Sequence, residues 1–587
     1  MSRIDPHSYA DDTQPRTKSF DWRASVDFPA RVLHAEVTLR FAEPAAGGPL
    51  DLDTRALSID AVLDGHGAAL GFVLHAPDPI LGSRLEITVP AGAESIRIRY
   101  RTSPEASALQ WLTPEQTLGK QHPYLFSQCQ AIHARSVLPC QDTPSIRQTF
   151  TASLDVPSEL RAVMAAAPRA REVQGERAIQ RFDMPQPIPP YLLAFAVGDL
   201  ASKDLSPRSR VWTEPAQLEA AAWELAVVED HLHAAESLFG PYDWDRFDLL
   251  VMPPSFPYGG MENPRLTFLT PSLLAGDRSL VNVLAHELAH SWTGNLVTNA
   301  TAEHFWLNEG FTVFAERRIL EVLEGPEMAA LHAAIGYQRL EQAFAQHADR
   351  PELTKLRTQL TGIDPDDAFS QVPYEKGYLF LKALEAAAGR EAFDRLLATW
   401  LGAHRFGSAT TDDFLALVEK ESPGLLAKVD ARAWVDEPGL PASYRKPESA
   451  RLAAVLEVAD RGRVPSASEA KSWSVTEWQL YLEAMPKPSP LAVCEDLDTT
   501  YSLTRSTNAE VLVSWLVLAC ESGYGAVLPR VEALLGDLGR MKYLKPLYKA
   551  LAGRAETKAL ANDLFARFSG SYHPIAQQLI RRVLATA

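Results

Sequence analysis

Two histidines and two glutamates stand at spacings that suit a catalytic metal site. The sequence contains His286-Glu287-x-x-His290, and Glu309 follows nineteen residues after the second histidine. On a helix, His286 and His290 lie on one face about one turn apart, so two imidazole nitrogens can converge on one ion. Glu287 projects at an angle to this pair and can reach a water at the metal without binding the ion. Two histidines, one carboxylate and an open fourth position predict a catalytic site with one Zn²⁺ per chain.

The simpler interpretation is that these histidines are ordinary core or surface residues, because an HExxH pattern also arises by chance. However, the flanking residues, such as Leu284, Leu288 and Trp292, are apolar, so the motif lies on a helix that is expected to be buried. A buried glutamate with two histidines requires partners or a metal, which favours the metal site. A second helical run, 305–320, carries Glu309 and, seven residues later on the same face, Glu316. Glu316 is either a hydrogen-bond partner for an imidazole N–H or an ordinary surface glutamate, and the sequence favours neither.

A loop at residues 254–270 contains a second candidate functional segment. It reads Gly259-Gly260-Met261-Glu262-Asn263 and stands between Pro257 and Pro264. Two glycines allow another backbone to approach closely, and the prolines disfavour regular pairing. Such a loop-edge strand can pair with an extended peptide through main-chain hydrogen bonds. Glu262 could be an exposed turn residue, but beside a peptidase-type metal site we interpret it as a substrate-binding residue.

Composition and charge exclude several classes of protein. The net charge of −17 argues against binding to nucleic acid or to an anionic membrane surface. The four cysteines form no CxxC pair, which fits a reducing compartment. The start of the chain shows no apolar signal segment, and no apolar run is long enough to span a bilayer. We therefore predict a cytoplasmic protein.

The length of 587 residues predicts about three domains. Residues 1–203 show period-two alternation and turn signals, which predict an antiparallel β-sheet domain. Residues 204–437 mix strands and helices around the metal motif. Residues 438–447 are rich in proline and predict a linker, and residues 448–587 have the 3.6-residue periodicity of a helical domain.

Six motifs together resemble one enzyme family. HELAH, WLNEG, GGMEN, QCQAIHARSVLPCQDTPS, VPYEKG and GRMKYLKPLYK occur in the order typical of the gluzincin zinc aminopeptidases, in the leukotriene A4 hydrolase/aminopeptidase B branch. The resemblance covers essentially the whole chain. It implies a multidomain α+β fold with an N-terminal antiparallel β saddle, a thermolysin-like α/β zinc catalytic domain and a C-terminal α-helical superhelix domain.

The resemblance also implies a role for each motif residue. His286, His290 and Glu309 would bind zinc, Glu287 would be the general base, and Tyr374 would stabilise the tetrahedral intermediate. The implied substrate-binding residues are Gln130 and Glu262 for the α-amino group, Gly259, Gly260 and Met261 along the peptide backbone, and Arg540 and Lys542 for the carboxylate of a short peptide. We therefore predict a monomeric zinc aminopeptidase that acts on short peptides with a free N-terminus.

Three other functions remain to be weighed. The first is hydrolysis of a lipid epoxide, which the resemblance implies as an alternative. Asp366 matches the acidic residue that this activity needs in the resembled hydrolase and Gln128 is present, but Phe369 stands where that hydrolase has a tyrosine. The second is a non-catalytic peptide-binding protein, which predicts loss of a ligand or of Glu287, and none is lost. The third is an endopeptidase, against which Glu262 argues. Asp366, if it lies at the floor of the pocket, would favour an N-terminal Arg or Lys.

Overall fold

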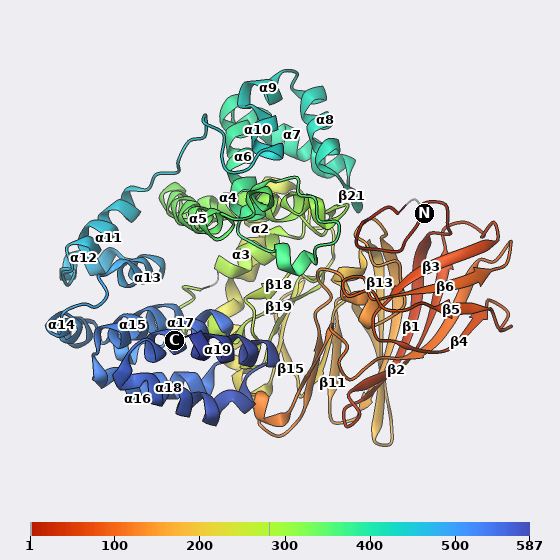
Figure 1. Ribbon diagram of the computed structural model, residues 1–587, viewed down its shortest axis with the longest axis horizontal. Coiled ribbons are helices and arrows are strands. Elements are labelled where there is room, and N and C mark those ends of the chain that lie inside the picture. The colour runs from red at the N-terminus through yellow and green to blue at the C-terminus, as the bar shows by residue number, and fades with distance from the viewer. Residues whose placement is uncertain (1–2, 281, 587) are drawn as a thin grey trace.

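The chain forms a β-rich part, an α/β part and a helical part. The structure is a computed structural model that describes residues 3–280 and 282–586; residue 281, within the predicted metal-binding helix, lies outside the described residues. In Figure 1 the N-terminal strands lie on the right, the central α/β part lies at the centre and top, and the C-terminal helices lie at the lower left. The element order agrees with the predicted fold class.

The described residues of the N-terminal part form three sheets. The largest runs in the order β12 (Ala167–Gln174), β13 (Arg177–Ile188), β10 (Gln148–Pro157), β1 (Thr17–Asp27), β2 (Val32–Phe41), β7 (Ser95–Arg101) and β4 (Ser58–Asp64). The second sheet has four strands in the order β11 (Arg161–Met164), β14 (Phe195–Gly198), β9 (Tyr124–Ser127) and β8 (Leu109–Leu112). The third has three strands in the order β3 (Gly48–Thr54), β6 (Ser83–Val89) and β5 (Phe72–Leu74). The large sheet departs from the antiparallel prediction at one pair, because β1 and β10 run parallel.

The central part is built on a five-stranded sheet. Its order is β15 (Ala201–Ser206), β16 (Ser209–Thr213), β17 (Asp248–Val251), β19 (Leu266–Leu269) and β18 (Gly260–Met261), so β18 is an edge strand. β15 crosses the predicted boundary after residue 203 and pairs with β16. A two-stranded sheet joins β20 (Val297–Asn299) to β21 (Gly407–Ala409).

Ten helices belong to the described residues of this central part. They are α1 (Leu218–Glu224), α2 (Val228–Phe239), α3 (Asn282–Ala289), α4 (Trp306–Glu324), α5 (Pro326–Gln346), α6 (Val372–Ala388), α7 (Arg390–Ala403), α8 (Thr411–Glu421), α9 (Leu425–Val429) and α10 (Ala431–Asp436).

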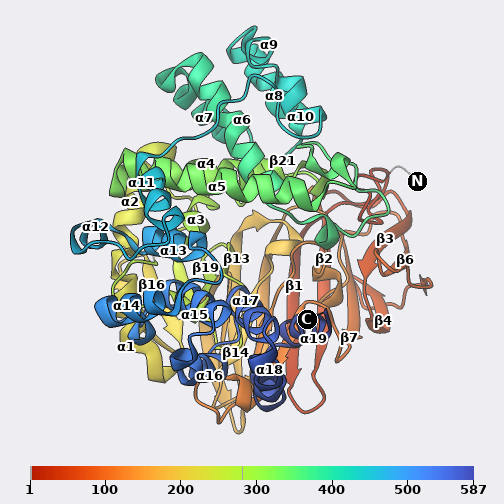
Figure 2. The same ribbon diagram turned by 60° about the vertical axis from the view of Figure 1, so that its left-hand side comes forward.

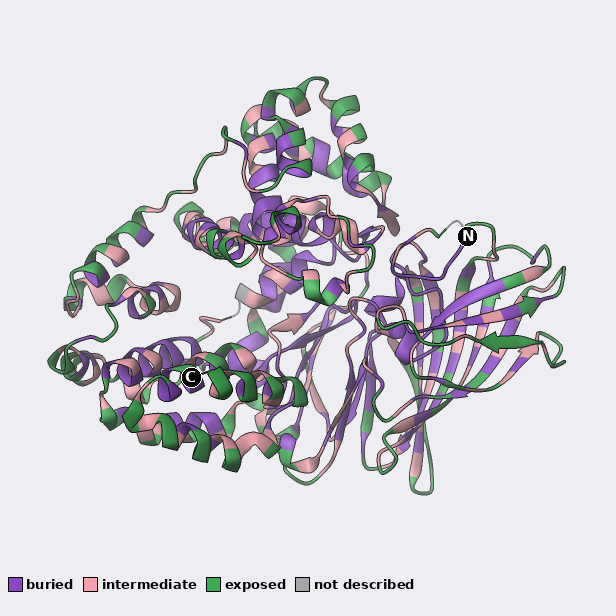
Figure 3. Ribbon diagram, in the orientation of Figure 1, coloured by how far each residue is buried: buried purple, intermediate pink, exposed green. Residues whose placement is uncertain are grey.

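Alternation along β17 places the central sheet between two cores. Leu250 joins the apolar core of the N-terminal sheets, whereas Leu249 and Val251 join the core formed with the helices. Met261 on β18 also packs into the N-terminal core. Buried segments accordingly continue from the strands into the central helices in Figure 3. The free edge of β18 therefore lies where two domains meet.

The C-terminal part is entirely helical in the described residues. It comprises α11 (Ala450–Asp460), α12 (Ala467–Ser472), α13 (Val475–Ala484), α14 (Leu491–Tyr501), α15 (Ala509–Ser522), α16 (Leu528–Asp537), α17 (Met541–Ala552), α18 (Ala555–Phe568) and α19 (Pro574–Thr586). Helices α11, α13, α15, α17 and α19 pack one against the next in this order, as expected for a helical superhelix. Their core includes Leu331 of α5, so this domain is attached to the central one. Figure 2 shows these helices in front of the central strands.

None of the helices in the described ranges is long and apolar enough to cross a membrane.

Candidate active site

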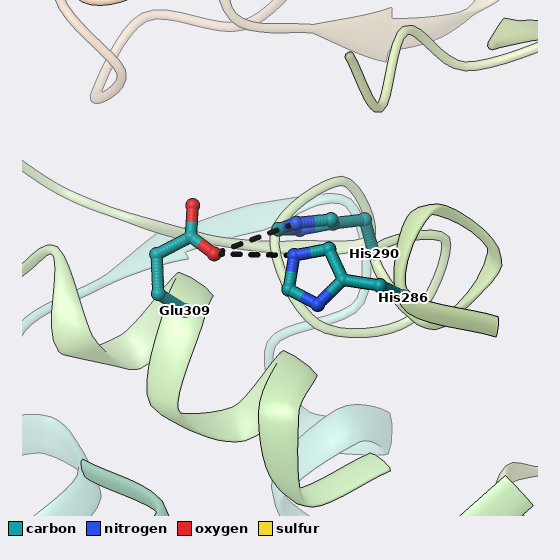
Figure 4. Close-up of side chains that lie close together, drawn as sticks. All are labelled: His286, His290 and Glu309. Atoms are coloured by element: carbon teal, nitrogen blue, oxygen red, sulfur yellow. Dashed lines mark ion pairs between the residues drawn. The ribbon is translucent and has the colours of Figure 1, made fainter. Parts of the chain in front are cut away.

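His286, His290 and Glu309 converge at the junction of α3 and α4. The Nε2 atoms of His286 and His290 lie 3.7 and 3.5 Å from Oε2 of Glu309. The imidazole rings are nearly perpendicular, with centroids 4.9 Å apart, and Figure 4 shows both facing the carboxylate. Glu309 lies in the first turn of α4, where the helix dipole stabilises a carboxylate. The three ligand atoms are close enough to hold one metal ion.

The other nitrogen of each imidazole is held by a hydrogen bond. Nδ1 of His286 donates to Oε2 of Glu316 at 2.9 Å, and Nδ1 of His290 donates to the carbonyl of Thr293 at 3.2 Å. Both Nε2 atoms therefore face Oε2 of Glu309 and can bind a metal ion in their unprotonated form. Such outer partners fix the tautomer and orientation of metal-binding histidines.

The charges and pKa shifts of this cluster favour a bound cation. Burial lowers the pKa of His286, but the hydrogen bond to Glu316 and its charge outweigh burial and raise that pKa to about 10. Burial raises the pKa of Glu309, whose Oε2 has no hydrogen-bond partner among the described residues. A buried oxygen of this kind, facing two imidazole nitrogens, fits a divalent ion that replaces the proton on Nε2 of His286. The donor set of two nitrogens and one carboxylate suits Zn²⁺.

Glu287 lies against the edge strand β18. A Cβ atom on Gly260 would stand 2.2 Å from Oε1 of Glu287, so glycine at this position makes room for the carboxylate. Burial raises the pKa of Glu287 to about 8, with a further contribution from the charge of Glu262. A carboxyl group that titrates near neutrality is suited to exchange protons with water.

Glu262 follows directly after β18 and is 5% exposed. Its backbone carbonyl accepts a hydrogen bond of 2.7 Å from Nδ2 of Asn295, and its Oε1 lies 3.5 Å from Nε2 of Gln130. Burial raises the pKa of Glu262. The structure thus brings together Gln130 from the N-terminal domain and Glu262 from the central sheet, the two residues to which the resemblance assigns the α-amino group.

Tyr374 completes this side of the site from the first turn of α6. Its ring stacks on that of His286, with centroids 6.3 Å apart and an interplanar angle of 19°. Burial and the charge of Glu309 raise its pKa well above the usual value, so the hydroxyl remains a proton donor. Helices α4 and α6 cross at Gly310 and Gly377, where a Cβ on either glycine would lie within 2.8 Å of the other's Cα. This close crossing sets the distance between Glu309 and Tyr374.

These residues line one cavity of about 740 Å³. Its wall includes the apolar side chains Phe305, Leu353, Leu356, Leu360, Phe369 and Ile575. Ile575 belongs to α19, so all three domains contribute to the cavity. No lysine or arginine of the described ranges lines it. A larger hollow, of about 1010 Å³, lies on the polar face of the N-terminal sheet and shares no residue with this site.

Arg540 and Lys542 lie outside the wall of the cavity. The Nη2 atom of Arg540 is 3.2 Å from the position of a Cβ on Gly259, so this guanidinium reaches the edge of the substrate strand. Lys542, in contrast, forms an ion pair of 2.7 Å with Glu510. The same glutamate lies 3.5 Å from Arg540, and the role of both cations toward a peptide carboxylate stays a prediction.

Asp366 and Phe369 lie at the exposed side of the cavity. A preference for an N-terminal Arg or Lys is expected only if Asp366 lies at the floor of the pocket. That condition is not met, because this side chain is 52% exposed. Its Oδ2 accepts a hydrogen bond of 2.8 Å from Nε2 of His133. Phe369 is 56% exposed, and its ring centroid lies 5.7 Å from that of Tyr374. Nε2 of Gln128 lies 3.1 Å from Sδ of Met261, so Gln128 supports the GGMEN segment.

Several supporting residues were not predicted from the sequence. Asn295 anchors Glu262, and Gly294 approaches His290 so closely that a Cβ would lie 2.7 Å from Nδ1. Gly294 has φ +129°, a conformation that favours glycine. A glycine and an asparagine shortly after the HExxH helix are a turn signal that could have indicated both.

The site and the fold define a zinc-dependent hydrolase of the HExxH class with an α/β catalytic domain. Comparison with known protein families supports this assignment. Residues 223–434 match the peptidase family M1 domain, residues 16–192 match the peptidase M1 N-terminal domain, and residues 473–584 match the C-terminal domain of leukotriene A4 hydrolase.

Individual relatives extend the similarity over the whole chain. Leukotriene A-4 hydrolase of Xenopus laevis is 39% identical over 99% of both chains. Leucine aminopeptidase 2 of Neurospora crassa is 36% identical over 99% of this chain and 90% of its own length. The solved structure of native yeast leukotriene A4 hydrolase superimposes with a TM-score of 0.92 at 34% identity, covering 99% of this chain and 97% of the yeast chain.

The chain therefore belongs to peptidase family M1 and carries the C-terminal domain of leukotriene A4 hydrolase. The predicted family, the three-part architecture, hydrolytic activity and zinc as the cofactor are confirmed.

Proposed function

We propose that this enzyme is an aminopeptidase that releases N-terminal residues from short peptides. The position of Glu262 carries the proposal: a buried carboxylate in the same cavity wall as His286, His290 and Glu309. A carboxylate pairs strongly with an N-terminal ammonium, whereas an internal peptide bond offers it no charge. Gln130, beside Glu262, adds a neutral partner for the same group.

The edge strand supports the preference for short peptides. β18 is paired on one side only, with β19, so an extended peptide can add along its free edge. An extended chain advances about 3.3 Å per residue, so the segment 259–262 spans roughly 10 Å. A peptide whose amino group is bound by Glu262 would bring its carboxylate near Arg540 after about three residues. Tripeptides are therefore the expected substrates.

We assign the chemical steps to this chain's own residues. His286, His290 and Glu309 would hold a Zn²⁺, which supplies Lewis acidity toward a carbonyl and lowers the pKa of water. Glu287 accepts a proton from the attacking water and delivers it to the leaving amine. The hydroxyl of Tyr374 donates a hydrogen bond to the oxygen on which negative charge develops.

A substrate panel tests this function. The purified enzyme is expected to hydrolyse aminoacyl-anilides and tripeptides, to leave their N-acetylated forms intact and to lose activity with a chelator. Arg540→Ala should impair tripeptides more than an anilide, which has no carboxylate. Rapid cleavage of N-acetylated peptides would instead indicate an endopeptidase.

A second candidate is hydrolysis of a lipid epoxide at the same metal site. The apolar side chains of the cavity, together with the leukotriene A-4 hydrolase among the relatives, favour it. Phe369 at the exposed side departs from the tyrosine expected there. Incubation with a fatty-acid epoxide, followed by analysis for a diol, separates this activity from the peptidase.

We also propose that the enzyme is a cytoplasmic monomer. All four cysteines, Cys129, Cys140, Cys494 and Cys520, are buried and unpaired, which fits a reducing compartment. Size-exclusion chromatography with light scattering tests the oligomeric state, and fractionation of the native cell tests the location.

A further inference from the structure

Glu510 lies between the two cations of the proposed carboxylate site. Its Oε2 is 2.7 Å from Nζ of Lys542, and its Oε1 is 3.5 Å from Nη1 of Arg540. Oε1 also accepts a hydrogen bond of 3.0 Å from the hydroxyl of Tyr543. Glu510 is 9% exposed in the first turn of α15, whereas both cations come from the start of α17. The acid is therefore a built part of the site.

The two guanidinium nitrogens of Arg540 have different surroundings. Nη1 donates to Oγ of Ser272 and to the hydroxyl of Tyr543, both at 2.9 Å, besides facing Glu510. Nη2 has no hydrogen-bond partner within the described part of the chain and lies beside Gly259. One side of the guanidinium is thus fixed by protein groups, and the other side points to the strand along which the peptide would lie.

The charges of the cluster leave one net positive charge. Burial raises the pKa of Glu510, but the charges of Lys542 and Arg540 together outweigh burial and lower that pKa, so this carboxylate is ionised at neutral pH. Burial lowers the pKa of Lys542, and the charge of Glu510 opposes that change. Two cations therefore share one resident anion before any substrate carboxylate arrives.

We propose that Glu510 determines specificity at this site by acting as the resident counter-ion of Arg540 and Lys542. It pairs closely with Lys542, at 2.7 Å, and more loosely with Arg540, at 3.5 Å, so an incoming carboxylate meets mainly Nη2 of Arg540. Glu510 then weakens the binding of peptides that end in a free carboxylate and prevents the site from trapping other anions. The proposal rests on the proposed peptidase function, because it takes the substrate to be a short peptide.

The substitution Glu510→Gln tests the sign of this effect. The amide keeps the shape of the side chain and removes its charge, so Lys542 becomes available to the substrate. We expect the KM of a tripeptide with a free carboxylate to fall about three- to tenfold. The ratio of kcat/KM for that tripeptide to kcat/KM for an alanyl-anilide should rise by the same factor. Glu510→Asp keeps the charge and should change this ratio less than twofold.

Two outcomes would overturn the proposal. If Glu510→Gln raises the KM of the tripeptide or leaves it unchanged, Glu510 only orients Arg540. If the KM of the C-terminally amidated tripeptide falls equally, the carboxylate is not the group that is sensed. Far-UV circular dichroism and the melting temperature identify any variant that fails to fold. If Glu510→Gln does not fold, Glu510→Ala, which also removes the charge, carries the comparison with the same expected fall in KM.

Binding measurements keep the proposal separate from the peptidase function. Calorimetry with zinc-loaded Glu287→Gln enzyme, with and without Glu510→Gln, needs no turnover. The acid form of the tripeptide should bind more tightly in the double variant, and the amide form should bind equally in both. Failure of the wild-type enzyme to cleave any peptide would refute the proposed function alone, whereas equal binding of the acid form would refute the role of Glu510.

Discussion

Gly260 and Glu287 lie directly against each other in the active site. A Cβ atom on residue 260 would stand only 2.2 Å from Oε1 of Glu287. The strand proposed to bind the peptide is thereby fitted to the helix that carries the proposed base. Any side chain at position 260 must displace either the strand or the carboxylate.

We therefore expect Gly260→Ala to lower kcat by about 100-fold, since a displacement near 1 Å at a catalytic group has effects of that order. Zinc content, measured by atomic absorption, should be unchanged. Gly259→Ala is the matched control. Its Cβ would meet only the flexible end of Arg540, at 3.2 Å, so its effect should remain below tenfold and be confined to peptides with a free carboxylate.

Glu287→Gln should retain zinc and abolish most turnover. General base catalysis typically contributes about 100- to 10,000-fold, so the loss of kcat should lie in that range. Steady-state kinetics on an anilide, with metal analysis of the same sample, measures both quantities. A variant that keeps a near-normal rate would show that another group takes the proton.

Glu262→Ala should raise KM and lower kcat for substrates with a free amine, because the ammonium loses its buried counter-charge. Loss of a charge-assisted hydrogen bond of this kind costs about 1.5 to 3 kcal/mol, which corresponds to roughly 10- to 150-fold in kcat/KM. Asn295 holds only the backbone of residue 262, so the strand and the zinc content should persist. Equal kinetics for wild-type and variant enzyme would remove the basis for an exopeptidase.

Glu316→Gln should weaken zinc binding without removing the general base. Glu316 accepts the Nδ1 proton of His286, and loss of such a partner typically lowers metal affinity about 10- to 100-fold. Dialysis against buffered zinc measures the affinity. Excess zinc should restore activity to this variant but not to Glu287→Gln, and absence of rescue would mean that Glu316 has another role.

Lys376 should make the stability of the catalytic domain depend on pH. This buried lysine donates to the carbonyls of Thr354 and Glu437, and burial lowers its pKa to about 7. Between about pH 7 and pH 10 the unfolded chain therefore binds one more proton at this site than the folded chain, so unfolding becomes less favourable as pH rises.

The comparison with Lys376→Met isolates this group. From pH 7 to pH 9 the wild-type enzyme should gain roughly 2 to 3 kcal/mol of stability relative to the variant. Melting temperatures of both proteins across this range provide the measurement. A difference that does not change with pH would mean that Lys376 is charged in the folded enzyme throughout.

Much of the catalytic site follows from the sequence, because its parts are neighbours along the chain. His286 and Glu287 lie on α3 and His290 directly follows its last residue, with its N–H still bonded to the carbonyl of His286, so local helix geometry places them around a common point. Gly259 to Glu262 form one short segment, whose glycines and prolines already indicate an edge strand. The order of β-rich, α/β and helical parts is likewise visible in local periodicity, which depends on residues only a few positions apart.

Only the tertiary structure decided between alternatives that depend on distant segments. The sequence left Glu316 as either a surface glutamate or a partner of an imidazole, and the packing of α3 against α4 places it on His286. Packing also pairs Lys542 with Glu510 and leaves Asp366 exposed beside His133. Local periodicity cannot determine such pairs, because their contacts depend on how the helices and domains pack against each other.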